Sequence, residues 1–409
     1  MRTEERLHAL DAVRAFALLS GIVLHAAMTF MPGLTALGFP ADSSQSPTLQ
    51  TVFYVIHVFR MTLFFMIAGY FAHLMFHRRG TAGFLRDRAK RILVPLVVGW
   101  IVFGPLAMAL VFMGLGPSVQ GAAAAPALSA FPLSHLWFLY YLLLLYGATL
   151  AFRGLFMRLL DRQGRQRARI DGWVRTLVQG YAAPVLLAAP IAGCFYLMPN
   201  WIMWSGIASP DTGLTPQLPA MIGFGTAFAF GWLLHRQSEL LKVWEQRWAM
   251  HLGLAVAFTA LSLWLVERAP HPFAVAPSIK LAYAACYTLG LWNWIFGIIG
   301  AALRFFSGES AVRRYLADSS YWLYLAHLPV VFALQMTVLK WHLHWSIKFP
   351  LIVSVATAVL LLSYHYLVRN TYIGEILNGR KYPRMRTTVS PIIAEPRISA
   401  PQFPCSEKR

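Results

Sequence analysis

The chain has 409 residues, of which 58% are hydrophobic and only 12% are charged. A charged share about half that of an ordinary soluble domain excludes a water-soluble protein and predicts an all-α, multi-pass membrane protein. The net charge of +19 is divided among alternate loops rather than gathered in one stripe. We therefore expect no nucleic-acid partner, and we attribute the charge to membrane topology.

Ten apolar runs are long enough to cross about 30 Å of hydrocarbon as helices. In chain order they occupy residues 11–30, 52–76, 92–114, 134–152, 178–198, 218–234, 249–266, 276–302, 318–338 and 349–368. The segments that join the spans lie alternately on the two sides of the membrane. Most of the 35 Lys and Arg residues lie in segments on the same side as the N-terminus. The segments on the other side carry only Arg268, Lys340 and Lys348. Because basic loops stay in the cytoplasm, both termini are predicted to be cytoplasmic.

The chain is expected to form one membrane domain over residues 1–368, followed by a basic, proline-containing, disordered cytoplasmic tail over residues 369–409. Cys194, Cys286 and Cys405 show neither paired spacing nor a CxxC motif, so we expect no disulfide framework and no metal site. The sequence also has no GxSxG, HExxH or P-loop motif. The reactive groups must therefore come from the spans themselves.

The first span carries the most informative polar residues. Arg14 and His25 are separated by about three helical turns, so their side chains lie on one face, about 16 Å apart. An arginine inside a span costs about 2.5 to 3.5 kcal/mol, which predicts a buried polar cavity around it. Asp11 lies one turn before Arg14 and is expected to hold its guanidinium.

Other polar residues lie inside later spans. His57 and Arg60 can share a helix face, as can Tyr324 and His327, and His135 opens the fourth span. Each histidine could instead make a structural hydrogen bond between helices. Among the small residues of the spans, Gly69 is expected to permit the close approach of a neighbouring helix.

These motifs resemble the acyltransferase-3 family of integral membrane enzymes. The segment LDAVRAFALLSGIVLHA (10–26) is similar to the family's opening signature, an arginine and a histidine in the first span. Three later segments resemble family elements in the same order: FRMTLFFMIAGYF (59–71), with Ala68 in place of the usual serine, RDRAKRILVP (86–95) and SSYWLYLAHLP (319–329). HVFRM (57–61) and SHLWFLYYL (134–142) are most similar to the glucans biosynthesis protein C group, which succinylates osmoregulated periplasmic glucans.

The resemblance implies an O-acyltransferase of the bacterial inner membrane that moves an acyl group from a cytoplasmic acyl-CoA to a glycan hydroxyl. A neutral histidine can take the hydroxyl proton, and we assign this role to His25, with Arg14 positioning the donor. The expected donor is succinyl-CoA, or else acetyl-CoA, and no tightly bound cofactor is expected. The lipid bilayer, a periplasmic glucan or other glycan acceptor, and glucan biosynthesis proteins are the expected partners.

Arginines are the natural ligands of the donor's anionic groups. Arg86, Arg88 and Arg91 lie where the third span meets the cytoplasm and could bind phosphates, although the positive-inside rule also explains them. Arg60 lies on the outer side of its span, where topology gives no reason for a cation. We therefore predict that Arg60 binds the free carboxylate of a succinyl donor.

The remaining candidates are expected around the acyl group or the acceptor. His57, His135 and Trp137 are assigned there, although Trp137 fits an aromatic belt at the membrane surface better than a sugar-binding platform. Tyr324 and His327 are expected to support His25.

Two alternative functions stay open. One is O-acetylation of a lipopolysaccharide, peptidoglycan or exopolysaccharide sugar, and the other is a transporter or flippase without covalent chemistry.

Overall fold

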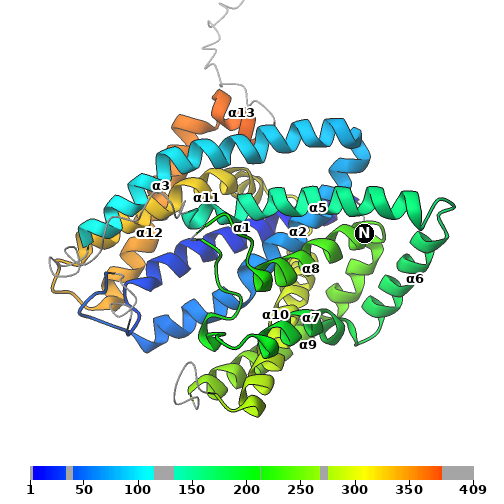
Figure 1. Ribbon diagram of the computed structural model, residues 1–409. Coiled ribbons are helices and arrows are strands. Elements are labelled where there is room, and N and C mark those ends of the chain that lie inside the picture. Colours follow the sequence, from blue (N-terminus) through cyan, green and yellow to red (C-terminus); the bar gives the residue numbers. More distant parts are fainter. Residues whose placement is uncertain (1–2, 34–39, 115–132, 212, 268–274, 380–409) are drawn as a thin grey trace, which may run out of the picture.

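The computed structural model describes residues 3–33, 40–114, 133–211, 213–267 and 275–379. These residues form helices and contain no strand (Figure 1). The α-helices are α1 (Thr3–Met28), α2 (Pro47–Arg88), α3 (Val94–Gly114), α5 (Trp137–Leu159), α6 (Arg165–Gln179), α7 (Ala183–Leu197), α8 (Leu218–His235), α9 (Leu241–Glu267), α10 (Pro277–Phe305), α11 (Ala311–Val338), α12 (Trp345–Ser363) and α13 (Tyr372–Asn378). Short π-helical or 3₁₀ turns are η2 (Ala89–Leu93), η4 (Ser134–Leu136), η5 (Met203–Ser205), η6 (Ser238–Leu240) and η7 (Tyr364–Val368).

The predicted all-α membrane fold is confirmed. In the described part of the chain, 8 helical stretches are long and apolar enough to cross a membrane, or up to 9 if a bent pair is one span. One stretch of 64 residues, Pro47–Leu110, contains the predicted span 52–76 and most of the predicted span 92–114. Gly80, with a φ of 65°, breaks the helix there, and the chain folds back from α2 to α3 (Figure 1).

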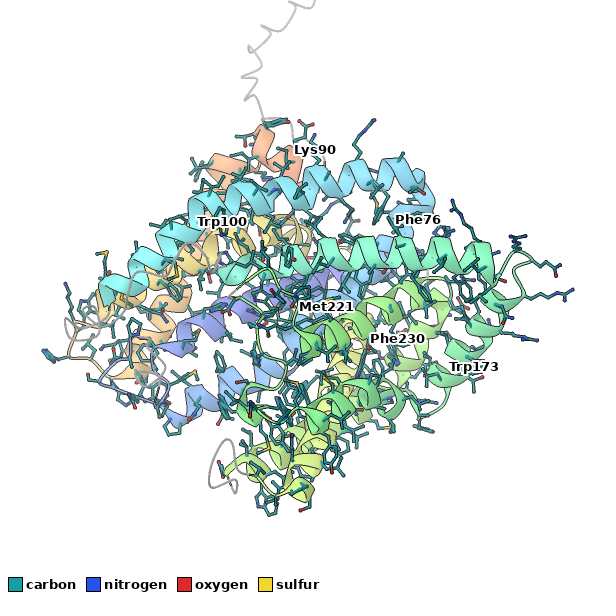
Figure 2. All side chains as sticks on the ribbon, viewed as in Figure 1. Phe76, Lys90, Trp100, Trp173, Met221 and Phe230 are labelled. Atoms are coloured by element: carbon teal, nitrogen blue, oxygen red, sulfur yellow. The ribbon has the colours of Figure 1, made fainter. Side chains whose placement is uncertain are left out.

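The predicted span at residues 178–198 coincides with α7, which is short. Helix α7 is long enough to cross a membrane only together with α6, and the two helices are bent by 103° relative to each other. The basic segment that precedes α7 is therefore largely helical. Trp173 of α6 is 81% exposed and lies at the edge of the molecule (Figure 2).

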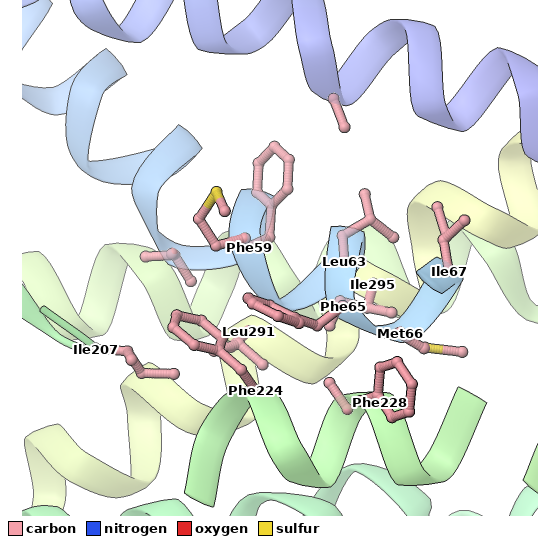
Figure 3. Close-up of a cluster of buried hydrophobic side chains, with 14 of the residues drawn as sticks. Phe59, Leu63, Phe65, Met66, Ile67, Ile207, Phe224, Phe228, Leu291 and Ile295 are labelled. Carbon is pink, nitrogen blue, oxygen red and sulfur yellow. The ribbon is translucent and has the colours of Figure 1, made fainter. Parts of the chain in front are cut away.

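Two glycines bring α2 and α8 into close contact. A Cβ atom on Gly69 would overlap the carbonyl oxygen of Phe228, and one on Gly231 would overlap that of Met66. The predicted role of Gly69 is thus confirmed. Beside this contact, the rings of Phe65 and Phe224 stack with centroids 4.7 Å apart, and Figure 3 shows the apolar cluster that surrounds them. This packing fixes the helix that carries Arg60.

Helix α1 packs against α2, α10, α11 and α12, so its polar residues lie among other helices. The side-chain amide of Gln335 donates to the carbonyl of His25 at 2.8 Å and fixes α11 against α1. A buried ion pair of 2.7 Å between Lys348 and Asp42 joins α12 to the segment after α1. Both side chains are 0% exposed. These two contacts hold the C-terminal part of the first span and the segment after it.

The range predicted as a disordered tail begins with an ordered helix. Helix α13 is held by Arg91, whose Nη2 donates to the carbonyl of Leu377 at 2.9 Å. Asn378 also donates to the hydroxyl of Tyr364 at 3.0 Å. These contacts hold α13, whose Gly374 and Leu377 are buried, against the rest of the chain just beyond the last span. The rest of the predicted tail, residues 380–409, lies outside the described residues.

Candidate active site

A cavity of about 1060 Å³ lies among α1, α2, α3, α5 and α11. Along α1 its lining runs from Arg14 to Met28, and along α2 it runs from Arg88 back to Phe53. We call the part lined by Arg14, Arg88 and Arg91 the basic end. We call the part lined by His57, Ser134 and Asp211 the loop end. Arg14 and His25, which the sequence analysis singled out in the first span, therefore both line an internal space.

Three histidines from distant parts of the sequence meet in this cavity. The ring centroids of His25 and His327 are 5.0 Å apart, and those of His135 and His327 are 5.3 Å apart. We call these residues the histidine cluster. They come from α1, η4 and α11, so three separate spans each supply one ring. The sequence identified each histidine, and the structure shows that they belong to one site.

Backbone carbonyls fix two rings of the histidine cluster. Nδ1 of His327 lies 2.7 Å from the carbonyl oxygen of Tyr324, and Nε2 of His135 lies 3.0 Å from that of Leu325. A carbonyl oxygen can only accept, so both of these ring nitrogens must carry hydrogen. The other nitrogen of each neutral ring then has a lone pair. Both rings are thus set to accept a hydrogen bond.

His25 differs from its two neighbours. Its Nδ1 is buried and has no hydrogen-bond partner in the part of the chain that the structure describes. The ring lines the cavity and belongs to the same helix as Arg14. A histidine whose ring is not held by protein groups is free to exchange a proton with a bound molecule.

Arg60 approaches His25 across the surface of α1. Gly21 lies one turn before His25, and a Cβ atom there would overlap Nη1 of Arg60. Nε of Arg60 is buried without a hydrogen-bond partner among the described residues, and no described carboxylate forms an ion pair with this guanidinium. A cation in this state can receive an anionic group of a ligand.

The basic end is organised by a buried carboxylate that the sequence analysis did not single out. Asp87 accepts from Arg88 and Arg79 at 2.6 Å each, and Arg91 lies 4.0 Å away. Arg79 precedes the break at Gly80 and Asp87 follows it, so the Arg79–Asp87 pair bridges this break in α2. The Asp-Arg pairs in RDRAKR were a possible signal, but the positive-inside rule already accounted for that segment.

The other predicted donor ligands have different surroundings. Arg14 lies 3.2 Å from Asp11, so the predicted contact between them is present. Arg88 and Arg91 line the cavity. Arg86 is exposed, and it does not belong to the cavity lining as far as the chain is described. The structure thus brings Arg88 and Arg91 to the basic end and leaves Arg86 on the surface.

The predicted acceptor ligands lie toward the loop end. His57 lines the cavity, and its Nε2 lies 3.1 Å from the carbonyl oxygen of Ser205. Trp137 also contributes to the lining, although its ring stacks on Phe224 with centroids 5.4 Å apart. The hydroxyl of Tyr324 donates to the carbonyl of His135 at 2.7 Å. Tyr324 thus supports His135 directly, a contact that spacing alone does not predict.

Asp211 lines the cavity, and the sequence analysis did not single it out. Its carbonyl accepts from the backbone N–H of Leu133 at 2.8 Å and of Ser134 at 3.2 Å. Partial desolvation raises the pKa of its carboxyl above the ordinary value. A lone carboxylate in a segment without helical periodicity gives no sequence signal for such a contact. Among the described residues, no group of three or more His, Cys, Asp or Glu could hold a metal ion.

Comparison with known proteins identifies the family. The family model described as an acyltransferase domain, that of acyltransferase-3, matches residues 7–365. The chain belongs to the acyltransferase-3 family. The match includes every helix that lines the cavity. The protein is therefore a multi-pass membrane acyltransferase.

Several curated relatives of this acyltransferase carry the name glucans biosynthesis protein C. The protein from Salmonella paratyphi B is 26% identical over 342 residues, which cover 80% of this chain and 82% of that protein. The proteins from Salmonella heidelberg and Salmonella schwarzengrund are each 28% identical, with the same coverage of both chains. No solved structure matches the chain.

Asp87→Asn is expected to destabilise the acyltransferase strongly. The substitution keeps the shape of the side chain but leaves the largely buried guanidinium of Arg88 without its counter-charge, at a cost of about 3 to 5 kcal/mol. The matched control is Glu375→Gln, which removes an exposed ion pair of 3.8 Å with Lys90 and should cost about 1 kcal/mol or less. Thermal unfolding in detergent measures both, and equal shifts in Tm would show that Asp87 does not organise the basic end.

Proposed function

We propose that this acyltransferase moves a succinyl group from a cytoplasmic acyl-CoA to a sugar hydroxyl of a periplasmic glucan, in a bacterial inner membrane. The observation that carries the proposal is the histidine cluster, which lies in the same cavity as the basic end and the loop end. The name of the curated relatives supports a glucan as the acceptor. We propose glucan biosynthesis proteins as partners that present it.

In this reaction His25 is the general base. It takes the proton of the attacking hydroxyl while the hydroxyl oxygen bonds to the acyl carbon, and the carbon–sulfur bond of the thioester then breaks. The proton passes from His25 to the leaving thiolate, so the products are an ester and free coenzyme A. The free ring of His25 supports this assignment, because backbone carbonyls hold the rings of His135 and His327, whereas no described group holds that of His25.

The proposed donor contacts divide between the two sides of the histidine cluster. Arg14, Arg88 and Arg91 at the basic end hold the phosphates of the acyl-CoA. Arg60, near His25, holds the free carboxylate of the succinyl group. The acyl-CoA is a substrate in this proposal, and no resident cofactor is needed. The distribution of cations along the cavity supports both assignments.

Arg14→Lys is expected to raise the KM for the acyl-CoA about tenfold or more. Lysine keeps the charge but loses the planar fork that binds two oxygens at once. The control is Arg86→Lys, because Arg86 is exposed and does not line the cavity in the described structure. Steady-state kinetics with varied donor compare the variants, and the same KM for Arg14→Lys and wild type would remove the donor role.

Mass spectrometry of the periplasmic glucan fraction tests the proposed function. Cells that carry the protein should yield glucan with the added mass of succinyl groups, and cells without it should yield unmodified glucan. An identical glucan from both strains would refute the proposal. Acetyl esters on surface polysaccharides would then be examined, and a loss of acetyl groups would support the O-acetyltransferase alternative.

A further inference from the structure

His135 lies where two locally unfavourable features of the backbone meet. Ser134, directly before it, has a φ of 49°. No other non-glycine residue in the described part of the chain has a positive φ. Pro329 lies inside α11, where it interrupts the helical hydrogen bonds. Such features persist only where the surrounding structure imposes them, and they concentrate at functional sites.

Pro329 explains how the ring of His135 is fixed. A residue at position 329 would normally donate its backbone N–H to the carbonyl of Leu325, four residues earlier. Proline has no N–H, and its ring pushes that carbonyl away from the helix axis. Nε2 of His135 instead donates a hydrogen bond to the free carbonyl oxygen of Leu325, 3.0 Å away. Since the carbonyl can only accept, Nε2 carries the hydrogen and Nδ1 has the lone pair.

Hydrogen bonds to Asp211 and from Tyr324 fix the backbone around His135. The N–H groups of Leu133 and Ser134 donate to the carbonyl of Asp211, and the hydroxyl of Tyr324 donates to the carbonyl of His135. The residue is 8% exposed, and its Nδ1 has no partner among the described residues. Nδ1 of His135 is therefore a rigid, buried and unused hydrogen-bond acceptor in a residue that lines the cavity.

The ring of His327, next to that of His135, also has a free hydrogen-bond acceptor. His327 carries hydrogen on Nδ1, which contacts the carbonyl of Tyr324, so its Nε2 also has a lone pair. Two acceptors whose rings lie 5.3 Å apart suit a ligand that carries several hydroxyl donors. A sugar has this chemistry, whereas an acyl thioester has no hydroxyl to offer at its reacting end.

We propose that Pro329 is a positioning residue for the glycan acceptor. By freeing the carbonyl of Leu325, it holds His135 in the form with hydrogen on Nε2, so that Nδ1 accepts a hydrogen bond from a sugar hydroxyl beside the one that reacts. The proposal rests on the proposed function for the identity of the ligand. The state of the His135 ring, however, can be measured without any reaction.

The test uses Pro329→Ala in the full-length protein, with Pro190→Ala as the matched control. Pro190 also lies inside a helix, α7, and is exposed. Nitrogen-15 NMR of histidine-labelled protein reports which ring nitrogen carries hydrogen, and His135→Asn identifies the signals of His135. We expect hydrogen on Nε2 in wild type and in Pro190→Ala. In Pro329→Ala we expect a mixture of both forms, because the backbone N–H that the substitution introduces competes for the carbonyl of Leu325.

Kinetics supply the second measurement. For Pro329→Ala, kcat/KM for the glucan should fall about tenfold, the size of one lost hydrogen bond, while the KM for the acyl-CoA stays unchanged. An unchanged His135 spectrum in Pro329→Ala would overturn the proposal, as would a changed spectrum with unchanged glucan kinetics. If wild type acylates no glucan, the proposed function fails, and the NMR result still decides whether Pro329 sets the state of His135.

Discussion

His25→Ala is expected to abolish glucan succinylation in cells while the protein still inserts and folds. A positioned general base contributes about 10²- to 10⁴-fold to the rate, and no other ring of the histidine cluster occupies its place on α1. The carbonyl of His25 can still accept from Gln335, so the contact between α1 and α11 is retained. The measurement is the succinyl content of glucan at equal protein level, together with the Tm of the purified variant.

The control for this prediction is a buried histidine outside the cavity. His251 is hydrogen-bonded to Asn293 at 2.8 Å and is not among the residues that line the described cavity. His251→Ala should lower Tm because it leaves the amide of Asn293 without this bond, yet the rate per folded molecule should stay near wild type. Normal succinylation in His25→Ala cells would remove the base assignment.

Arg60→Ala is expected to change the choice of donor. If the guanidinium holds a free carboxylate, its loss should reduce turnover of succinyl-CoA by about 10- to 100-fold, the range of one hydrogen bond to a charged group. Turnover of acetyl-CoA should change much less, because an acetyl group has no carboxylate. Competition between the two donors in one reaction measures this ratio directly. Equal losses for both donors would exclude the carboxylate role.

Gly21→Ala tests the position of the Arg60 guanidinium without changing Arg60 itself. The new methyl group would overlap the guanidinium of Arg60, whose flexible end can move away at small cost to folding. We therefore expect a normal Tm and a shift in donor preference in the same direction as for Arg60→Ala. Gly147→Ala is the control, because a Cβ atom there meets nothing within 4 Å. An unchanged donor preference in Gly21→Ala would show that the position of Arg60 is not critical.

The sequence predicted the membrane helices well because apolar length is a local property. The runs at residues 52–76 and 92–114 were identified as separate spans, although one helical stretch contains the first and most of the second. The basic segment between them marked the turn, and Gly80 supplies the break. The tail was predicted less well. Its first helix depends on contacts such as Arg91 with Leu377, which join residues distant in sequence.

The sequence predicted most of the individual residues of the candidate site, but not which of them lie close together in space. Helical periodicity placed Arg14 and His25 on one face, and both line the cavity. Periodicity cannot show that His135 and His327 approach the same point, because the order of helices in space is a tertiary property. Asp87 and Pro329 were missed for a different reason. Each acts through a partner that only the folded chain supplies.

The most direct test uses the purified protein in detergent, where both ends of the cavity are accessible. Radiolabelled succinyl-CoA is incubated with succinyl-free periplasmic glucan, and label bound to the glucan through an alkali-labile ester is counted. The proposed mechanism predicts labelled glucan with wild type and none above background with His25→Ala. Unlabelled glucan with wild type, or equal labelling with the variant, would contradict it.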